Sequence, residues 1–237
     1  MKKSNNPLVS IIIVVKNGEK FLQTAIESIL NQSYKNYEII VIDGNSIDKT
    51  PIIVQSYSQI RYFLQNSQGI ANAYNQGIDE AKAELLTFLS CDDIWTYDKL
   101  KIQVDYMINN PKIQYVVGKV KFFLEERNLP PSGFKKELLE EDHIAKIMET
   151  LMVRKNVFEK IGKFNPEFLI AEDTDWFARC QDAKIPMKII DKVFLYKRIH
   201  NNNASLNDPQ YNQYILKILR ESIHRKRKNL TDTKLCY

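Results

Sequence analysis

The first half of the sequence alternates between short apolar runs and longer segments whose apolar residues recur every three or four positions. Val9–Val15 is a continuous run rich in β-branched residues, which is typical of a parallel strand buried on both faces. Residues 19–33 follow, with apolar positions at helical spacing and charged or amide residues between them. The pattern therefore predicts a strand followed by an amphipathic helix.

The same succession continues as far as residue 89. The other elements predicted there are strands at Glu38–Ile42, Arg61–Leu64 and Leu85–Leu89 and a helix over Ile70–Ala83. Between the second and third strands, Asp48 or Ser46 can cap a further helix that carries Pro51 in its first turn. Strands that alternate with helices in this way predict an α/β fold with a doubly wound sheet.

The second half is less regular. The elements predicted there are a helix over Asp98–Asn109, one or two strands in Ile113–Phe123, a mobile charged excursion at Glu125–Glu141, helices over Asn156–Ile161 and from near Glu172, strands at Met187–Ile190 and Val193–Ile199, and a terminal helix from about Pro209. Neither a repeat nor a linker divides the chain. We predict a single domain, 1–208, with halves 1–95 and 96–208, followed by a basic amphipathic segment, 209–237.

Composition is that of a globular protein, with 44% apolar and 27% charged residues. The apolar run near the N-terminus is too short for a membrane span and lacks a small-residue cleavage site, so we interpret it as a core strand and not as a signal peptide. The cysteines, Cys91, Cys180 and Cys236, are odd in number and widely spaced. This usage favours a reduced, cytoplasmic protein.

The net charge of +5 lies in the C-terminal segment, where residues 217–237 hold seven Lys or Arg against two Asp or Glu. A body without net charge argues against nucleic acid as the main ligand. The segment also has apolar residues at helical spacing: Tyr214, Ile215, Ile218, Leu219 and Ile223. Three interpretations stay open, namely peripheral contact with the inner face of a membrane, a solvated tail, and a helix packed on the body.

Acidic residues follow two of the predicted strands. Asp43 ends the second strand, and Asp92 and Asp93 follow the fourth. The carboxyl ends of strands in such sheets are where ligands bind. Two adjacent carboxylates repel each other unless a cation lies beside them, and Mg²⁺ or Mn²⁺, which bind carboxylates together with substrate phosphate oxygens, are the simplest candidates. The alternative is that the acids only open a loop, with Asp98 capping the next helix.

Five stretches in fixed order carry a resemblance to a known family: VSIIIVVKNGEKFL, SILNQSYKNYEIIVIDGNSIDKT, GIANAYNQGIDEAKAELLTFLSCDDIW, AEDTDWFARC and YKRIH. From about Pro7 to Ser205 the chain resembles the family 2 glycosyltransferases. The resemblance implies a GT-A fold, which is a Rossmann-like doubly wound mixed sheet with an irregular C-terminal half. It also implies that residues 1–95 bind a nucleotide sugar and residues 96–208 bind the acceptor.

The resemblance assigns roles to single residues. Asp92 and Asp93 match the aspartate motif that holds a divalent metal against the donor diphosphate, although Ser90 stands where a further acid is frequent. His200 matches a late histidine that binds the metal, and an imidazole ligand favours Mn²⁺ over Mg²⁺. The residues matched to nucleotide and donor binding are Val15, Asn17, Asp43, Gly69, Asn75 and Asp92. Gly44 replaces a second acid beside Asp43, which leaves the base preference open.

The acidic pair Glu172–Asp173 matches the family's pair beneath the acceptor site, with Asp173 as general base and Glu172 as its positioning neighbour. Without the resemblance, acids in the first turn of a helix are explained by the helix dipole. Trp95 and Trp176 stand beside the two acidic motifs, where they stack on sugar rings or simply pack.

The activity that the resemblance implies is inverting transfer of a sugar, from a UDP-sugar as the expected donor, to an acceptor hydroxyl in surface polysaccharide or glycoconjugate synthesis. The acceptor is a glycan, a lipid-linked sugar or another hydroxyl, including one on a protein or a small molecule. An inactive binding protein with the same fold is the alternative from another class. A dehydrogenase is disfavoured because KNGEKF, not a G-x-G-x-x-G motif, follows the first strand.

Overall fold

The computed structural model of the chain describes residues 6–125, 129–131, 134–201, 203 and 210–234. In these residues one nine-stranded mixed sheet has the strand order β3-β2-β1-β4-β8-β6-β9-β5, with β7 paired to β6. The first four strands are β1 (Val9–Val15), β2 (Tyr37–Asp43), β3 (Ile60–Leu64) and β4 (Leu85–Ser90), which pair in parallel. The predicted α/β doubly wound mixed sheet is thereby confirmed.

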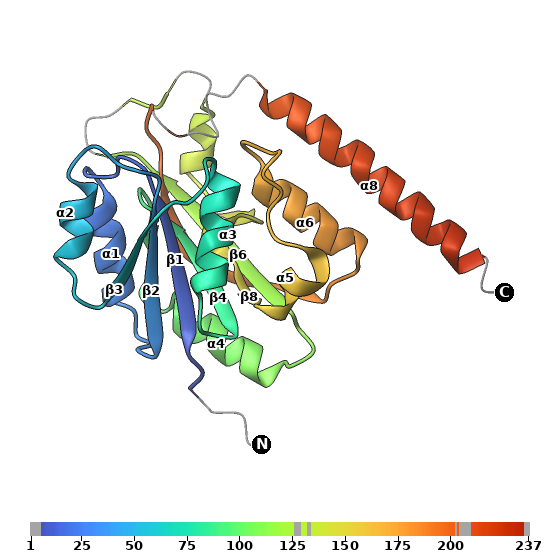
Figure 1. Cartoon of the computed structure of the whole chain (residues 1–237), viewed down its shortest axis with the longest axis horizontal. Coiled ribbons are helices and arrows are strands. Elements are labelled where there is room, and N and C mark those ends of the chain that lie inside the picture. Colours follow the sequence, from blue (N-terminus) through green and yellow to red (C-terminus); the bar gives the residue numbers. More distant parts are fainter. Residues whose placement is uncertain (1–5, 126–128, 132–133, 202, 204–209, 235–237) are drawn as a thin grey trace.

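Helices cover both faces of this sheet (Figure 1). One face carries α1 (Leu22–Leu30), α2 (Thr50–Gln55) and α4 (Lys99–Asn109), and the other carries α3 (Ile70–Glu80), α5 (Asn156–Ile161) and α6 (Glu172–Asp182). Alternate side chains of β1 serve the two layers, since Ile11 and Ile13 belong to the first core and Ile12 belongs to the second. The continuous apolar run of β1 is explained by this burial on both faces.

Helix α3 approaches β1 closely because Gly77 lacks a side chain. A Cβ atom at Gly77 would lie 2.4 Å from Cγ2 of Ile12, well inside van der Waals contact. The glycine thus lets α3 lie against the strand that leads to the first loop of the candidate site.

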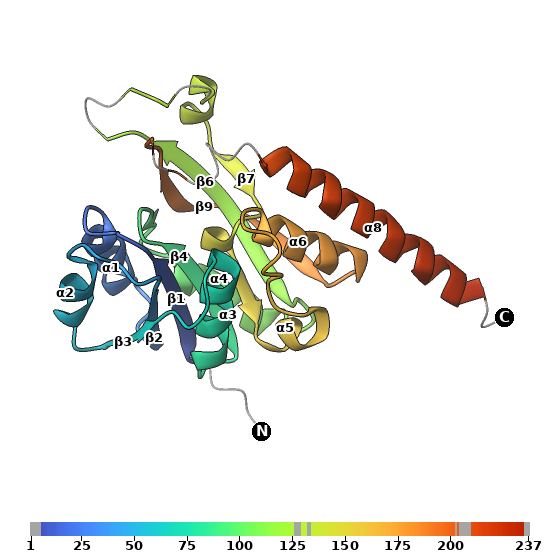
Figure 2. The same cartoon turned by 45° about the horizontal axis from the view of Figure 1, so that its top comes forward.

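The second half of the sheet is built from β5 (Ile94–Trp95), β6 (Tyr115–Phe123), β7 (His143–Ala145), β8 (Met152–Arg154) and β9 (Met187–Arg198), with 3₁₀ turns at Lys136–Leu139 and Met148–Thr150. The division of β9 into two strands was wrong. The strand continues through Asp191 and Lys192, and its pairing with β6 absorbs the irregularity by register shifts between Val117 and Val120. Figure 2 shows β9 and β6 running together to the edge where β9 ends.

The C-terminal helix α8 (Tyr211–Lys234) lies against α6 and extends away from the sheet (Figures 1 and 2). The predicted boundary at 208/209, the end of the resemblance at Ser205, part of the excursion at Glu125–Glu141, and Cys236 lie outside the described residues. Within the part of the chain that is described, no helix is both long and apolar enough to span a membrane.

Candidate active site

A cavity of about 1030 Å³ lies at the carboxyl ends of β1, β2 and β4. Its walls come from both halves of the chain. Val15, Gly44, Gly69 and Asp92 line it from the first half, and Glu149, Glu172, Asp173 and Lys197 line it from the second. The edge of the sheet where ligands were expected is therefore hollow, and four acidic side chains and three lysines, Lys16, Lys146 and Lys197, line it.

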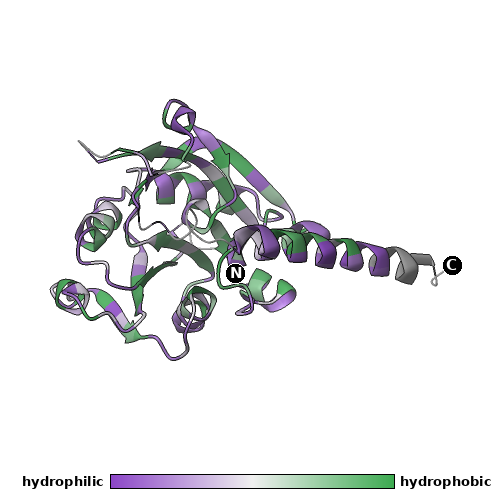
Figure 3. Cartoon of the chain, turned by 90° about the horizontal axis from the view of Figure 1, so that it is seen from above, coloured by the Kyte–Doolittle hydropathy of each residue, from purple (hydrophilic) through white to green (hydrophobic). Residues whose placement is uncertain are grey.

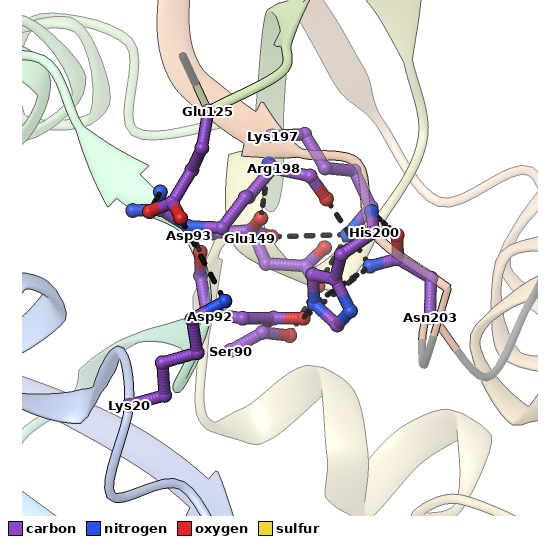
Figure 4. A network of polar contacts seen from close by, with 10 residues as sticks. All are labelled: Lys20, Ser90, Asp92, Asp93, Glu125, Glu149, Lys197, Arg198, His200 and Asn203. Carbon is purple, nitrogen blue, oxygen red and sulfur yellow. Dashed lines mark hydrogen bonds and ion pairs between the residues drawn. The ribbon is translucent and has the colours of Figure 1, made fainter. Parts of the chain in front are cut away.

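Asp92 lines this cavity and contacts His200, as Figure 4 shows. Asp92 Oδ2 lies 2.9 Å from His200 Nε2, and Asn203 fixes the loop because its Oδ1 accepts the His200 backbone N–H at 2.7 Å. Burial raises the pKa of Asp92, but the hydrogen bond from His200 and the charge of Lys197 outweigh it, so the pKa lies below its usual value. The group is therefore a carboxylate at neutral pH.

Asp93 points into the protein and away from the cavity. It is fully buried, its Oδ2 accepts from Lys197 Nζ at 3.0 Å, and its Oδ1 accepts from the Arg198 backbone N–H at 2.9 Å. Of the three predicted metal ligands, the structure thus brings Asp92 and His200 together and directs Asp93 to β9. Across the described ranges, no group of three or more His, Cys, Asp and Glu side chains is arranged to hold a metal.

The Asp92–His200 pair nevertheless fits a divalent ion. A carboxylate oxygen and an imidazole nitrogen 2.9 Å apart, both partly exposed, offer two ligands of the kinds that Mn²⁺ accepts. Mg²⁺ and Mn²⁺ sites in phosphate-binding enzymes commonly use one or two protein ligands and complete their shell with water and substrate oxygens. The side chains present are thus sufficient for a metal held jointly with a substrate.

Ser90 and Glu149 form a contact that the sequence did not indicate. The Ser90 hydroxyl donates to Glu149, and Lys197 Nζ lies 3.3 Å from the same Glu149 oxygen. Trp95 Nε1 holds the Glu149 backbone carbonyl at 3.0 Å. The position where a further acid was expected thus has a serine that binds an acid from elsewhere in the chain.

The pair Glu172–Asp173 forms the first turn of α6. The preceding Ala171 has φ of 70°, a left-handed conformation uncommon for a residue with a Cβ atom, and such strain is concentrated at functional sites. Burial raises the pKa of Glu172 to about 8, helped by the charge of Asp173. Burial and the charge of Glu149 raise the pKa of Asp173 to about 6. At neutral pH the pair therefore holds one proton, mainly on Glu172, and Asp173 can act as a base.

Some of the predicted donor-binding residues line the cavity, and the others hold in place the loops that surround it. Val15 and Gly69 line the cavity. Asp43 is fully buried, and it accepts from Tyr62 Oη at 2.6 Å and from the Ser46 hydroxyl at 2.6 Å. It therefore shapes the loop whose Gly44 forms the wall.

Two asparagines join segments that border the cavity. Asn17 holds the first loop to the second through the Ile47 backbone N–H, at 3.0 Å from its Oδ1. Asn75 binds both the N–H and the C=O of Phe164, each at 2.9 Å, and thereby ties α3 to the loop before α6. In this structure both side chains are occupied by backbone groups.

Trp95 and Trp176 are both buried, at 3% and 0% exposure, and belong to the two cores. Of the two interpretations left open for them, packing agrees with this placement. Pro51 lies in the first turn of α2, as predicted, but the N-cap residue is Lys49, and the helix has no side-chain cap. Asp48, one residue earlier, accepts the Thr50 N–H at 2.9 Å, and Ser46 is bonded to Asp43.

Comparison with known proteins identifies the family. The sequence model of glycosyl transferase family 2 matches residues 10–167. The chain belongs to this family. Uncharacterised glycosyltransferases of Rickettsia typhi and Rickettsia prowazekii are 32% and 31% identical over 218 residues, which is 85% of this chain and 68% of each of theirs. This member of the family is therefore a glycosyltransferase.

Solved structures agree on the fold. S. aureus TarS 1–349 in complex with UDP-GlcNAc has a TM-score of 0.73 at 19% identity, over 92% of this chain and 66% of that one. Mannosyltransferase PcManGT from Pyrobaculum calidifontis, in complex with GDP-Man and Mn²⁺, has a TM-score of 0.63 at 17% identity, over 84% of this chain and 59% of that one. The predicted GT-A fold is thus confirmed, and the chain spans 66% of TarS 1–349 and 59% of PcManGT.

Proposed function

We propose that the protein transfers a sugar from a nucleoside diphosphate, with a UDP-sugar as the expected donor, to an acceptor hydroxyl with inversion at the anomeric carbon. The observation that carries the proposal is a single cavity lined by both Asp92 and Asp173, which come from the two halves of the chain. Family membership and the UDP-GlcNAc bound by TarS support the donor class.

Asp173 would accept the proton of the attacking hydroxyl. As the acceptor oxygen bonds to the anomeric carbon, the bond from that carbon to the diphosphate oxygen breaks, and the diphosphate departs with the electron pair. A pKa of about 6 suits this role, because Asp173 is ionised at neutral pH and still basic enough to take the proton. Glu172, protonated at the same pH, limits the local negative charge and keeps the pair from repelling the donor.

The leaving diphosphate needs compensating positive charge. Lys197 lines the cavity, and the carboxylates of Asp93 and Glu149 raise its pKa above the usual value against the effect of burial, so it remains an ammonium group. Asp92 and His200 would hold a divalent ion, which supplies further charge neutralisation on the diphosphate when it is bound. Val15, Gly44 and Gly69 then form the wall for the nucleotide.

The test is a panel of UDP- and GDP-sugars incubated with the full chain and Mn²⁺, with release of the nucleoside diphosphate as the readout. We expect activity with a UDP-sugar. Asp173→Asn should lower turnover by about 10²-fold or more while donor binding by calorimetry persists. Asp92→Asn should weaken donor binding in Mn²⁺. The control Asp105→Asn, at a half-exposed side chain that pairs with Lys101 outside the cavity, should change neither turnover nor donor binding.

Two results would contradict the proposal. The first is an absence of binding and of hydrolysis for every donor in the panel, which would favour a binding protein of the same fold. The second is normal turnover by Asp173→Asn, which would remove the assigned base.

A further inference from the structure

Helix α8 packs on the body by one face only. Ile218 is buried among Phe168 and Ala171 in a small core that Tyr214 and Ile215 complete. Further along the helix, the Ser222 hydroxyl and Arg225 Nε each donate to the Asp182 carboxylate at 2.8 Å. The apolar residues that were predicted to form one stripe therefore lie on two faces of α8. Tyr214, Ile215 and Ile218 lie on the face that packs on the body, and Leu219 and Ile223 do not.

A second apolar stripe on α8 faces away from this contact. Leu216, Leu219 and Ile223 are 55%, 54% and 51% exposed, and their spacing of three and four residues places them along one side of the helix. Figure 3 shows hydrophobic and hydrophilic positions alternating along the projecting helix. A contiguous apolar stripe in water is unfavourable and marks an interaction surface.

Basic residues flank this stripe. At 100° per residue, Arg220 and Arg227 lie one turn beyond Leu216 and Ile223, at the edge of the stripe. Residues 211–228 hold six Lys or Arg and one Glu. Of the six, Lys217 pairs with Glu167, and Arg225 and Lys226 pair with Asp182. Docking of a second copy through the same stripe would bring these cations together, whereas an anionic surface complements both the charge and the apolar residues.

The position of α8 relates this stripe to the cavity. Tyr211, the first residue of the helix, lines the cavity, and so does Leu169, which is 63% exposed. The helix therefore begins at the wall of the cavity and runs outward from it. Anything that holds α8 also fixes where the cavity opens.

We propose that α8 lies on an anionic lipid surface, with Leu216, Leu219 and Ile223 inserted at the boundary of head groups and acyl chains and Arg220 beside the lipid phosphates. A helix with an apolar stripe and basic flanks binds in the plane of such an interface. Lipid binding itself does not depend on the reaction. That it brings the cavity to acceptors carried on the surface rests on the proposed transferase function.

The experiment is co-sedimentation of the full chain with vesicles of phosphatidylglycerol and phosphatidylcholine, and with vesicles of phosphatidylcholine alone. The triple variant Leu216→Gln, Leu219→Gln, Ile223→Gln removes the stripe without touching the face that packs on α6. Ile52→Gln together with Leu64→Gln is the matched control, since these side chains are exposed to 69% and 56% elsewhere on the protein.

We expect binding to the anionic vesicles, a loss of affinity of about tenfold or more in the triple variant, and no change in the control. Binding should also weaken as salt rises, because the basic residues contribute. Equal partitioning of wild type and triple variant at unchanged thermal stability would overturn the proposal. So would a dimer in sedimentation velocity that the triple variant dissociates while vesicle binding is absent.

Failure of this proposal can be told apart from failure of the transferase assignment. The triple variant should retain donor hydrolysis in solution, because none of its three positions lines the cavity. Lipid binding without turnover would instead count against the reaction and leave the membrane surface intact.

Discussion

Replacing Asp173 by asparagine should stabilise the fold while it abolishes transfer. Burial and Glu149 raise the pKa of Asp173 from 3.8 to about 6, so the folded protein binds a proton there more tightly than the unfolded chain does. A raised carboxyl pKa contributes stability only when the group is protonated, and that contribution is lost as the pH rises from about 4 to about 6. Above this window the ionised carboxylate lowers the free energy of unfolding. Asparagine, which has the same shape but no charge, removes this loss.

The magnitude follows from the shift in pKa. Two pKa units correspond to about 3 kcal/mol. Asp173 shares its titration with Glu172 and is partly open to the cavity, so we expect a gain of about 1–3 kcal/mol in the free energy of unfolding at pH 8. Asparagine still offers Oδ1 to the Thr174 backbone N–H, which Asp173 binds at 2.6 Å, so the start of α6 should keep its contact.

The assay is urea unfolding of wild type and Asp173→Asn at intervals from pH 4.5 to pH 8.5, with Asp105→Asn as a surface control. The advantage of Asp173→Asn should grow from small at pH 4.5 to its full value above pH 6. The reasoning is refuted by a variant that is no more stable than wild type at pH 8, or by an advantage that does not vary with pH.

Three further predictions concern residues around the site. Asp93→Asn should lower the melting temperature in the absence of metal by several degrees, because it removes one of the two buried carboxylates that pair with Lys197, the other being Glu149. An unchanged melting temperature would mean that Asp93 acts only on a ligand. Gly77→Ala should lower the free energy of unfolding in urea by about 1–3 kcal/mol, because the added Cβ would lie 2.4 Å from Ile12. An unchanged free energy of unfolding would show that α3 shifts freely. Lys99 is fully buried, and burial holds its pKa well below the usual value, so the free energy of unfolding should rise with pH toward 10. Lys99→Met should flatten that rise, and an unaltered slope in the variant would contradict the prediction.

The elements of the first half were predictable because their signals are local. Val9–Val15 is buried on both faces and α3 on one, and each leaves its own spacing of apolar residues. The short strands β5, β7 and β8 have two or three residues each, too few to show a period. They exist because neighbouring strands supply their hydrogen bonds, which a sequence pattern does not record.

The candidate site was predictable where a residue's position in the chain also fixes its place in the sheet. Asp92 follows β4 directly and so reaches the cavity. Glu149 lies in an irregular segment, and its contacts to Ser90 and Lys197 span 59 and 48 residues. Asp93 differs from Asp92 by one position, yet a turn of the backbone sends it to β9, which adjacency in the sequence could not reveal.

The two neighbouring aspartates thus have different roles. Asp92 faces the space where a substrate would enter, while Asp93 clamps the strand that ends just before His200. Any evolutionary exchange at Asp93 should therefore be accompanied by a change at Lys197, and engineered libraries that vary one of these positions alone should yield mainly members with lowered melting temperatures. His200, the partner of Asp92, follows a strand end that the buried carboxylate of Asp93 holds in place.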